Sequence, residues 1–204
     1  AAPLRDAAGG ITGSVLSVTD ITGRKALEDR LSFQAFHDPL TKLPNRALFT
    51  DRLEHALIRA ERSKTYVTVF FIDLDNFKKT NDTLGHDAGD DLLKATSERI
   101  LDSIRAGDTA ARLGGDEFTI MLDNITELDQ ALVVANRVLQ ALLQPVTLKG
   151  QEVYAPPSIG VAMGTWQQTP DEVMKNADAA MYTAKKNGKA RYEIYEEQPA
   201  SSPS

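Results

Sequence analysis

A nearly continuous apolar run, Val-Thr-Val-Phe-Phe-Ile-Asp from Val67 to Asp73, restricts the fold more than any other feature of the sequence. A run without polar alternation is typical of a central strand that is covered on both faces of its sheet. It leads into Asp73 and Asp75, and carboxylates at the end of a buried strand are costly unless they are paired or bind a metal. A carboxylate that caps the following turn is the structural alternative. The run therefore predicts a layered α/β fold with acidic groups at one end of its central strand.

A second constraint comes from Gly114 and Gly115, which separate two strand-like stretches. Two glycines at this place predict a tight hairpin turn, because glycine takes positive φ without steric cost. The turn would put Asp116 and Glu117 on an exposed tip, where a bound cation would relieve their repulsion. A solvated acidic turn is the alternative for such a short motif. If the hairpin lies beside the central strand, these two carboxylates converge with Asp73.

Composition narrows the class of protein. The 204 residues are 42% hydrophobic and 25% charged, which are ordinary values for a globular domain. A net charge of −6 argues against a nucleic-acid partner. The lack of cysteine excludes disulfides, zinc–thiolate sites and thiol nucleophiles, and no apolar run is long enough to span a bilayer. We expect a cytoplasmic chain, and membrane attachment of a longer protein stays open.

Helical periodicity appears in four segments, near residues 46–62, 87–105, 126–143 and 170–187. The last begins with a capping box over Thr169–Glu172. Segment 76–86 is interpreted only as polar. Further strands are expected from a hairpin around Lys149 that continues into residues 158–163, and at residues 191–195. The order predicts an α/β (α+β) sandwich with a central, mostly antiparallel sheet flanked by helices.

The flanking segments suggest a piece of a longer protein. Residues 1–20 predict a hairpin with its turn at 7–10, and a lone hairpin is marginal in water. Residues 21–36 predict a charged linker helix with a narrow apolar stripe formed by Leu27, Leu31 and Ala35. That stripe suits a coiled-coil seam, or a linker helix packed on its own domain. Residues 197–204 are expected to be a disordered tail.

The acidic residues indicate a class of chemistry. Hard oxygen ligands without His or Cys favour Mg²⁺ or Mn²⁺, and carboxylates that hold such ions suit phosphoryl or nucleotidyl transfer. Lys78 follows the central strand, and Lys185 and Lys189 lie at the end of the last helix. These lysines would bind phosphates as point charges. For the last two, a favourable interaction with the helix dipole is the alternative.

Several blocks together resemble the GGDEF-domain diguanylate cyclases. Arg112-Leu-Gly-Gly-Asp-Glu-Phe118 is similar to the family's signature, and the resemblance covers about residues 37–196. The other blocks follow the family's order: His37-Asp-Pro-Leu-Thr-Lys-Leu-Pro-Asn-Arg46, Ile72-Asp-Leu-Asp-Asn-Phe-Lys78, Asn81-Asp-Thr-Leu-Gly-His86, Gly89-Asp90, Ser158-Ile-Gly160 and Asn176-Ala-Asp-Ala-Ala-Met-Tyr-Thr-Ala-Lys185. The resemblance implies a nucleotidyl-cyclase or palm-like fold. It also implies condensation of two GTP into cyclic di-GMP by two domains that meet face to face as a homodimer.

The resemblance also implies roles for particular residues. Asp73 and Asp116, with the Leu74 carbonyl, would bind two Mg²⁺ (or Mn²⁺) ions per active site. Asp116 or Glu117 would help to remove the 3′-hydroxyl proton, and the choice between them stays open. The residues expected on the guanine edge are Asn81 and Asp90, and those on the triphosphate side are Phe77, Lys78, His86, Lys185 and Lys189. Lys78 also counts among the catalytic candidates.

Arg105 and Asp108 resemble the family's R-x-x-D site, at which the product inhibits the enzyme. A salt bridge at a helix end is the alternative. Three residues depart from the common pattern: Lys42 replaces a frequent glycine, Lys189 a frequent arginine, and Asp116 a frequent glutamate. At Lys189, a bidentate grip on phosphate would be weakened. None of these departures indicates an inactive enzyme.

Residues 1–20, which end in Val18-Thr-Asp-Ile-Thr, resemble the last strands of a PAS/PAC sensor domain followed by its helical connector. This implies a sensor upstream, and the family pattern suggests an EAL phosphodiesterase downstream. Two functions are therefore carried forward. One is an active cyclase inhibited by its product, and the other is a silent GTP-binding module that regulates a neighbouring domain.

Overall fold

The computed structural model describes residues 2–15, 20–23 and 33–196. It divides into two compact units, Ala1–Ala35 and Phe36–Ser204. Two residues of the predicted apolar stripe, Leu27 and Leu31, lie outside the described residues, as does the predicted tail. Within the described ranges, no helix has the length and apolar character that crossing a membrane requires.

The first unit contains an antiparallel hairpin of β1 (Ala2–Arg5) and β2 (Ile11–Val15). Asp6 shapes its turn, because Asp6 Oδ1 accepts the backbone N–H groups of Ala8 and Gly10 at 2.9 and 2.8 Å. The aspartate thus forms an Asx-type turn of the kind that favours chain reversal. The hairpin predicted for this segment is confirmed, and its turn falls where the sequence placed it.

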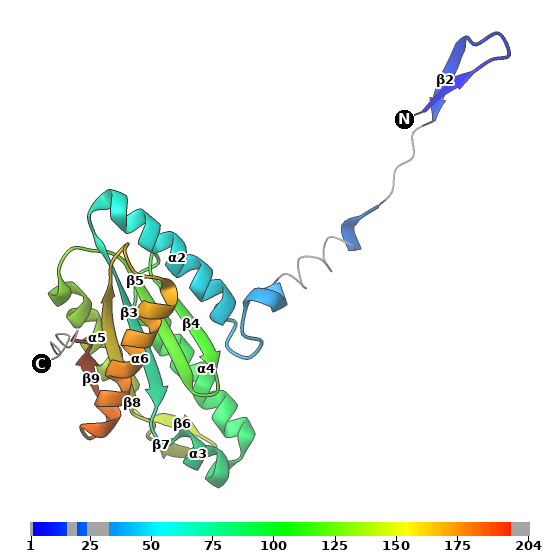
Figure 1. Cartoon of the computed structure of the whole chain (residues 1–204). Helices are drawn as coiled ribbons and strands as arrows, with labels where there is room; N and C mark the ends of the chain where they lie inside the picture. The colour runs from blue at the N-terminus through cyan, green and yellow to red at the C-terminus, as the bar shows by residue number, and fades with distance from the viewer. Residues whose placement is uncertain (1, 16–19, 24–32, 197–204) are drawn as a thin grey trace, which may run out of the picture. The chain divides into compact units, whose positions relative to one another are not determined.

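The second unit is built on a five-stranded sheet in the order β4-β5-β3-β8-β9 (Figure 1). β3 lies at its centre and pairs antiparallel with β5 and β8, while β8 and β9 are parallel. This confirms the predicted mostly antiparallel sheet and its buried central strand. The bounds are β3 (Tyr66–Leu74), β4 (Thr109–Gly114), β5 (Glu117–Ile125), β8 (Pro157–Gly164) and β9 (Arg191–Ile194).

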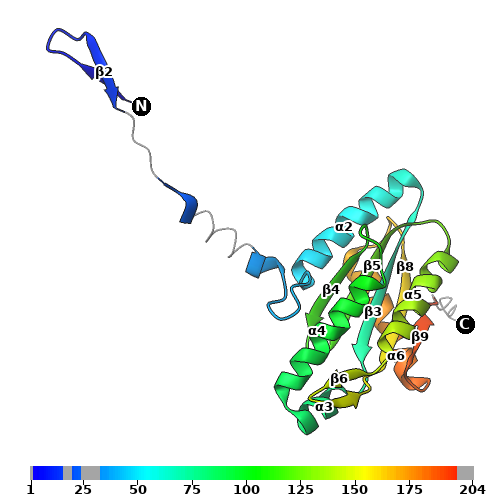
Figure 2. The same cartoon turned by 180° about the vertical axis from the view of Figure 1, so that it is seen from behind.

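Two helical layers cover this sheet, as Figures 1 and 2 show from opposite sides. One layer is α2 (Arg46–Ser63) with α6 (Pro170–Lys186), and the other is α4 (His86–Asp102) with α5 (Leu128–Leu142). Successive strand residues point to opposite faces. Along β3, Val67, Val69 and Phe71 therefore pack in the α2–α6 layer, and Phe70, Ile72 and Leu74 pack in the α4–α5 layer.

Gly160 on β8 lets α6 approach the sheet closely. A Cβ at this position would collide with the backbone carbonyl of Ala177 and the backbone nitrogen of Met181. The helix backbone thus lies directly on the strand, which is the contact for which a glycine is required. The capping box predicted at the start of α6 is present, with Thr169 and Glu172 bonded reciprocally.

Three short elements lie near the end of β3 in both views: α3 (Phe77–Leu84), β6 (Val146–Leu148) and β7 (Gln151–Val153). β6 and β7 form the predicted hairpin, as a separate two-stranded sheet. Segment 76–86 is polar, as predicted, but the helix α3 within it was missed from the sequence. The spacing of Phe77, Thr80 and Leu84 is helical, but eight residues give too short a pattern to stand out.

Candidate active site

The site begins at the C-terminal end of β3. Strand register places Glu117 of β5 directly beside Asp73 on one side, and Ser158 of β8 on the other. By alternation Asp73 continues the face of Val69 and Phe71, which is the face covered by α6. Lys185 of α6 lies within reach there, and its Nζ is 2.7 Å from Asp73 Oδ2. The predicted convergence of a central-strand carboxylate with the glycine hairpin is therefore confirmed.

The hairpin turn uses both of its glycines. Gly114 and Gly115 have φ of 144° and 53°, which glycine adopts without strain. The turn residues are Gly115 and Asp116, and the Asp116 carbonyl accepts the backbone N–H of Leu74 at 3.4 Å. This contact holds the turn against the end of β3.

Asp116 is half-buried in this turn. Its burial raises the pKa of its carboxyl, and the neighbouring charge of Asp73 raises that pKa further. Lys185 and Arg112 act in the opposite direction without cancelling the shift. A carboxylate in this position binds a proton or a cation more readily than a solvated one does.

Glu117 does not lie on an exposed tip, as the sequence suggested, because it is the first residue of β5 and is half-buried. Burial raises the pKa of its carboxyl, and Asp73 and Asp178 raise it further, while Arg46 lowers it. Arg46, the first residue of α2, has its Nη2 3.9 Å from Glu117 Oε2. The two acidic residues of the motif thus occupy different environments.

Arg112 ties the His37–Arg46 loop to the glycine turn. Its Nη1 donates to both carboxylate oxygens of Asp38, at 3.0 and 3.1 Å. Its Nε and Nη2 donate to the Gly115 carbonyl at 3.1 and 2.7 Å. The side chains of Arg112 and Asp38 are only 12% and 15% exposed, so the pair is shielded from solvent. Sequence reasoning missed this pair, although both residues belong to quoted motifs.

Asp75 has a structural role. Its side chain is 1% exposed, and its Oδ2 accepts the Ser158 hydroxyl at 2.9 Å and the Ala190 N–H at 3.3 Å. Lys189 Nζ lies 3.9 Å from Asp75 Oδ1. Asp75 therefore joins β3 to β8 and to the loop after α6. This accounts for a second carboxylate at the end of the buried strand.

The predicted guanine-edge residues Asn81 and Asp90 lie on α3 and α4, the two helices that pack on each other. Asn81 Oδ1 occupies the space beside Gly89, since a Cβ at position 89 would overlap it and would lie 3.3 Å from Phe77 Cζ. Gly89 directly precedes Asp90, which is exposed. The absence of a side chain at position 89 thus leaves room for Asn81 against α4, at the residue that precedes Asp90.

The remaining predicted phosphate ligands are less constrained. Lys78 and His86 are exposed, on α3 and at the first position of α4. Lys185 contacts Asp73, and Lys189 lies near Asp75. Each of these two lysines therefore lies near a carboxylate, in addition to its place at or just after the end of α6.

Arg105 and Asp108 form the salt bridge that the structural alternative expected. Arg105 Nε lies 3.1 Å from Asp108 Oδ1, and the backbone N–H of Arg105 donates to Asp108 Oδ2 at 3.2 Å. The Arg105 side chain is nevertheless 60% exposed, whereas that of Asp108 is 2% exposed. The pair precedes β4, and the glycine turn follows it, so the two lie at opposite ends of that strand.

The described residues supply part of a metal site. Among them, no group of three His, Cys, Asp or Glu side chains is arranged to hold a metal ion. Asp73 and Asp116 are nevertheless close enough for their charges to interact. Mg²⁺ commonly takes one or two carboxylates and completes its shell with water and substrate phosphate. The donor set therefore fits a hard cation that is shared with a phosphate ligand.

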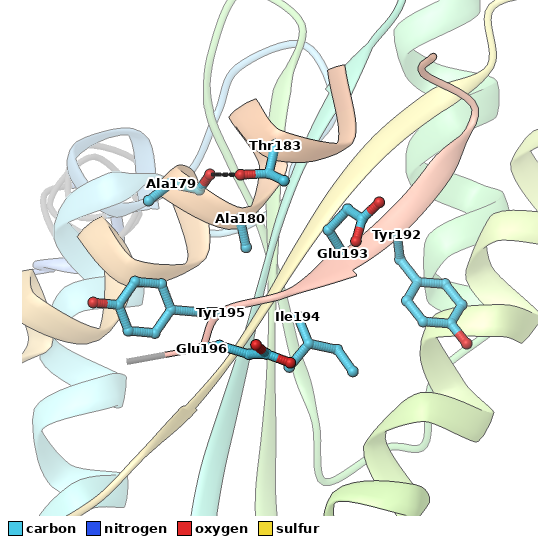
Figure 3. Close-up of a pocket in the computed structure, with 8 residues that line it drawn as sticks. All are labelled: Ala179, Ala180, Thr183, Tyr192, Glu193, Ile194, Tyr195 and Glu196. Carbon is cyan, nitrogen blue, oxygen red and sulfur yellow. Dashed lines mark hydrogen bonds between the residues drawn. The ribbon is translucent and has the colours of Figure 1, made fainter. Parts of the chain in front are cut away.

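A pocket of about 640 Å³ lies elsewhere, between α6 and the edge strand β9 (Figure 3). No predicted site residue lines it, and the Thr183 hydroxyl within it is already bonded to the Ala179 carbonyl at 3.1 Å. The pocket is therefore separate from the carboxylates and lysines gathered at the end of β3.

Comparison with known proteins agrees with this geometry. The family model described as "Diguanylate cyclase, GGDEF domain" matches residues 35–191. The bifunctional diguanylate cyclase/cyclic di-GMP phosphodiesterase MucR of Pseudomonas aeruginosa is 46% identical over 163 residues. Those residues are 79% of this chain and 24% of MucR, so the chain spans about a quarter of that relative.

Solved structures agree as well. The GGDEF domain of TpbB from Pseudomonas aeruginosa is 39% identical and superposes with a TM-score of 0.75, covering 78% of this chain and 94% of that one. The coiled coil and GGDEF domain of DgcB from Caulobacter crescentus, in complex with c-di-GMP, is 27% identical with a TM-score of 0.76. That match covers 85% of this chain and 93% of the DgcB chain. The chain described here belongs to the GGDEF domain family of diguanylate cyclases.

Proposed function

We propose that this domain condenses two GTP into cyclic di-GMP and two pyrophosphates. The observation that carries the proposal is the gathering of Asp73, Asp116, Glu117 and Lys185 at the end of β3, in a chain of the GGDEF family. Acidic groups beside a lysine suit nucleotidyl transfer, in which phosphate charge must be neutralised while a hydroxyl is activated.

Asp73, Asp116 and the Leu74 carbonyl would hold the two divalent cations, Mg²⁺ or Mn²⁺, that supply positive charge to the triphosphate. The 3′-oxygen of one GTP forms a bond to the α-phosphorus of the other, and the bond to pyrophosphate breaks. Asp116 or Glu117 accepts the hydroxyl proton, and the raised pKa of each suits it as a base. Lys185 and Lys78 would neutralise the departing pyrophosphate.

Guanine would be selected where α3 meets α4. Asp90 would accept from N1–H and the 2-amino group, a donor pattern that adenine lacks. Asn81 would bond the same base edge, and Phe77, His86 and Lys189 would border the nucleotide on its phosphate side. The packing of Asn81 against Gly89 supports this assignment, because Gly89 is the neighbour of Asp90 in α4.

The reaction also suggests an assembly. The cyclic product contains two new phosphodiester bonds, each made by one nucleotide on the other. If one domain holds one GTP, two domains must face each other, so we propose a catalytic homodimer. Residues 1–20 would be the end of a PAS/PAC sensor domain, which residues 21–36 would link to the cyclase domain, with an EAL domain as a candidate downstream partner.

Product inhibition is proposed at Arg105 and Asp108. Arg105 presents an exposed guanidinium, and its Nη2 donates to the Asp123 carbonyl at 2.5 Å, which fixes its direction. Exposed arginine is suited to bidentate contact with a phosphodiester. The structurally similar GGDEF domain of DgcB was solved in complex with c-di-GMP, which supports product binding by this fold.

A silent regulatory module that binds GTP is the second candidate. MucR carries both cyclase and phosphodiesterase in its name, so domains of this family occur beside the opposite activity. The two candidates differ in turnover. Protein stripped of nucleotide and given GTP with Mg²⁺ should form cyclic di-GMP, detected by mass, and Asp116→Asn should not. GTP binding without product in the stripped, dimeric wild type would favour the regulatory module.

A further inference from the structure

The β6–β7 hairpin is firmly attached to α4. Leu148 at the end of β6 is 4% exposed and packs with Leu92 and Ala88 of α4. At the base of the hairpin, Arg99 Nη1 and Nη2 donate to the carbonyls of Gln144 and Pro145, at 2.5 and 2.7 Å. Apolar packing and the two hydrogen bonds of the Arg99 guanidinium therefore fix the hairpin to α4.

The tip of the hairpin reaches the other helix. Lys149 Nζ donates to the carbonyl of Leu84, the last residue of α3, at 2.8 Å. Last-turn carbonyls form the negative end of a helix, where a cation is favoured. Lys149 itself has φ of 49°, a conformation that lysine adopts at a cost, beside Gly150 with φ of 80°. The Lys149 side chain thus connects the strained turn of the β6–β7 hairpin to the end of α3.

This bridge lies at the joint between the two helices. α3 and α4 are separated by Gly85 alone, with φ of 87° and ψ of 164°, which is a region essentially limited to glycine. The backbone N–H of Gly85 donates to the Asn81 carbonyl at 2.9 Å. The contact from Lys149 therefore acts within one turn of Asn81 and supports the joint that places it beside Gly89.

We propose that Lys149 is a positioning residue for guanine recognition: it ties the hairpin on α4 to the end of α3, and so holds Asn81 close to Asp90. The inference rests on the proposed function for the identity of the ligand. A contact that only stabilised the helix end would give the same hydrogen bond, but would leave base selectivity unchanged. Selectivity is therefore the quantity to measure.

Three variants of the whole chain separate these roles. Lys149→Met removes the charge and keeps the length, and Lys149→Arg keeps a donor that can reach the carbonyl. Lys64→Met is the matched control, because Lys64 also has positive φ and lies in the C-cap of α2. It sits beside the start of β3, whereas the candidate site lies at the other end of that strand.

The first measurement needs no nucleotide. Amide hydrogen exchange at Gly85 and Gly89 reports opening of the α3–α4 joint. We expect Lys149→Met to accelerate it about tenfold, Lys149→Arg to restore most of the protection, and Lys64→Met to leave it unchanged, in line with the loss of one charged hydrogen bond. Unchanged exchange in Lys149→Met would overturn the bridging role.

The second measurement compares equilibrium binding of the α,β-methylene analogues of GTP and ITP, which cannot lose pyrophosphate; the ITP analogue lacks the 2-amino group. Lys149→Met should lower the preference for GTP about fivefold to tenfold, with recovery in Lys149→Arg. Faster exchange with an unchanged preference would overturn the specificity role. If the parent protein bound neither nucleotide, the proposed function and its guanine assignment would fail together, while the exchange result would still decide the bridging role.

Discussion

The side-chain oxygen of Asn81 occupies the space that a Cβ on residue 89 would need, so Asn81 and Gly89 are matched in size across the α3–α4 contact. The glycine lies inside a helix, where alanine would normally stabilise by about 1 kcal/mol. It is therefore a position at which a substitution should affect nucleotide binding much more than stability.

Gly89→Ala should weaken GTP binding about tenfold, because the new methyl group displaces Asn81, while the free energy of unfolding falls little or rises. Calorimetric titration with GTP and urea unfolding measure the two effects. Gly107→Ala is the control, since a Cβ there meets no atom within 4 Å. Undiminished GTP affinity in Gly89→Ala would argue against the assignment of Asn81 to the base edge.

Arg112→Lys should destabilise the domain by about 1–3 kcal/mol, although it preserves the charge, because lysine cannot bond Asp38 and the Gly115 carbonyl at once. Urea unfolding gives the loss directly. Arg62→Lys, an exposed arginine in the last turn of α2, should cost less than about 0.5 kcal/mol. Equal losses in the free energy of unfolding for the two substitutions would show that the simultaneous bonds of Arg112 to Asp38 and Gly115 do not stabilise the domain.

Asp38 should make stability depend on pH in a predictable direction. Its burial acts to raise the pKa of its carboxyl, but hydrogen bonds from Thr41 and Arg112 outweigh it, so the pKa lies below the ordinary 3.8. The ionised carboxylate then stabilises the folded state fully above pH 3.8, and this contribution is lost as pH falls through the lowered pKa. The difference in unfolding free energy between wild type and Asp38→Asn should be constant from pH 7 to about 5, and should shrink below pH 3.8. A difference that grows on acidification would contradict the shift.

Local sequence patterns were sufficient for much of the fold. The apolar run predicted β3, because burial on both faces leaves a continuous signal. α2 and α5 followed from the helical periodicity of their segments, and the resemblance of the motifs implied that Asp73 and Asp116 share one site. The convergence of Asp73 with Glu117 was conditional on the hairpin pairing with β3, and strand order is not a local property.

Other parts depended on contacts between distant segments. Arg112 and Asp38 are 74 residues apart, and nothing local at either position shows that they meet. Asp75 reads like Asp73 in the sequence, yet its bonds to Ser158 and Ala190 make it structural. α3 was missed because two helical turns with one aromatic residue and few apolar ones resemble a polar loop.

We propose that two of these domains, each holding GTP near Asp73, Asp116 and Glu117, make cyclic di-GMP together. The most direct test is the initial rate of cyclic di-GMP formation from GTP and Mg²⁺ against the concentration of nucleotide-stripped protein. Below the dimer dissociation constant, we predict that the rate per chain rises in proportion to protein concentration, and that Asp116→Asn forms no product at any concentration. Product formation by Asp116→Asn at the wild-type rate, or no product from wild type at concentrations where it is shown to be dimeric and to bind GTP, would contradict the account.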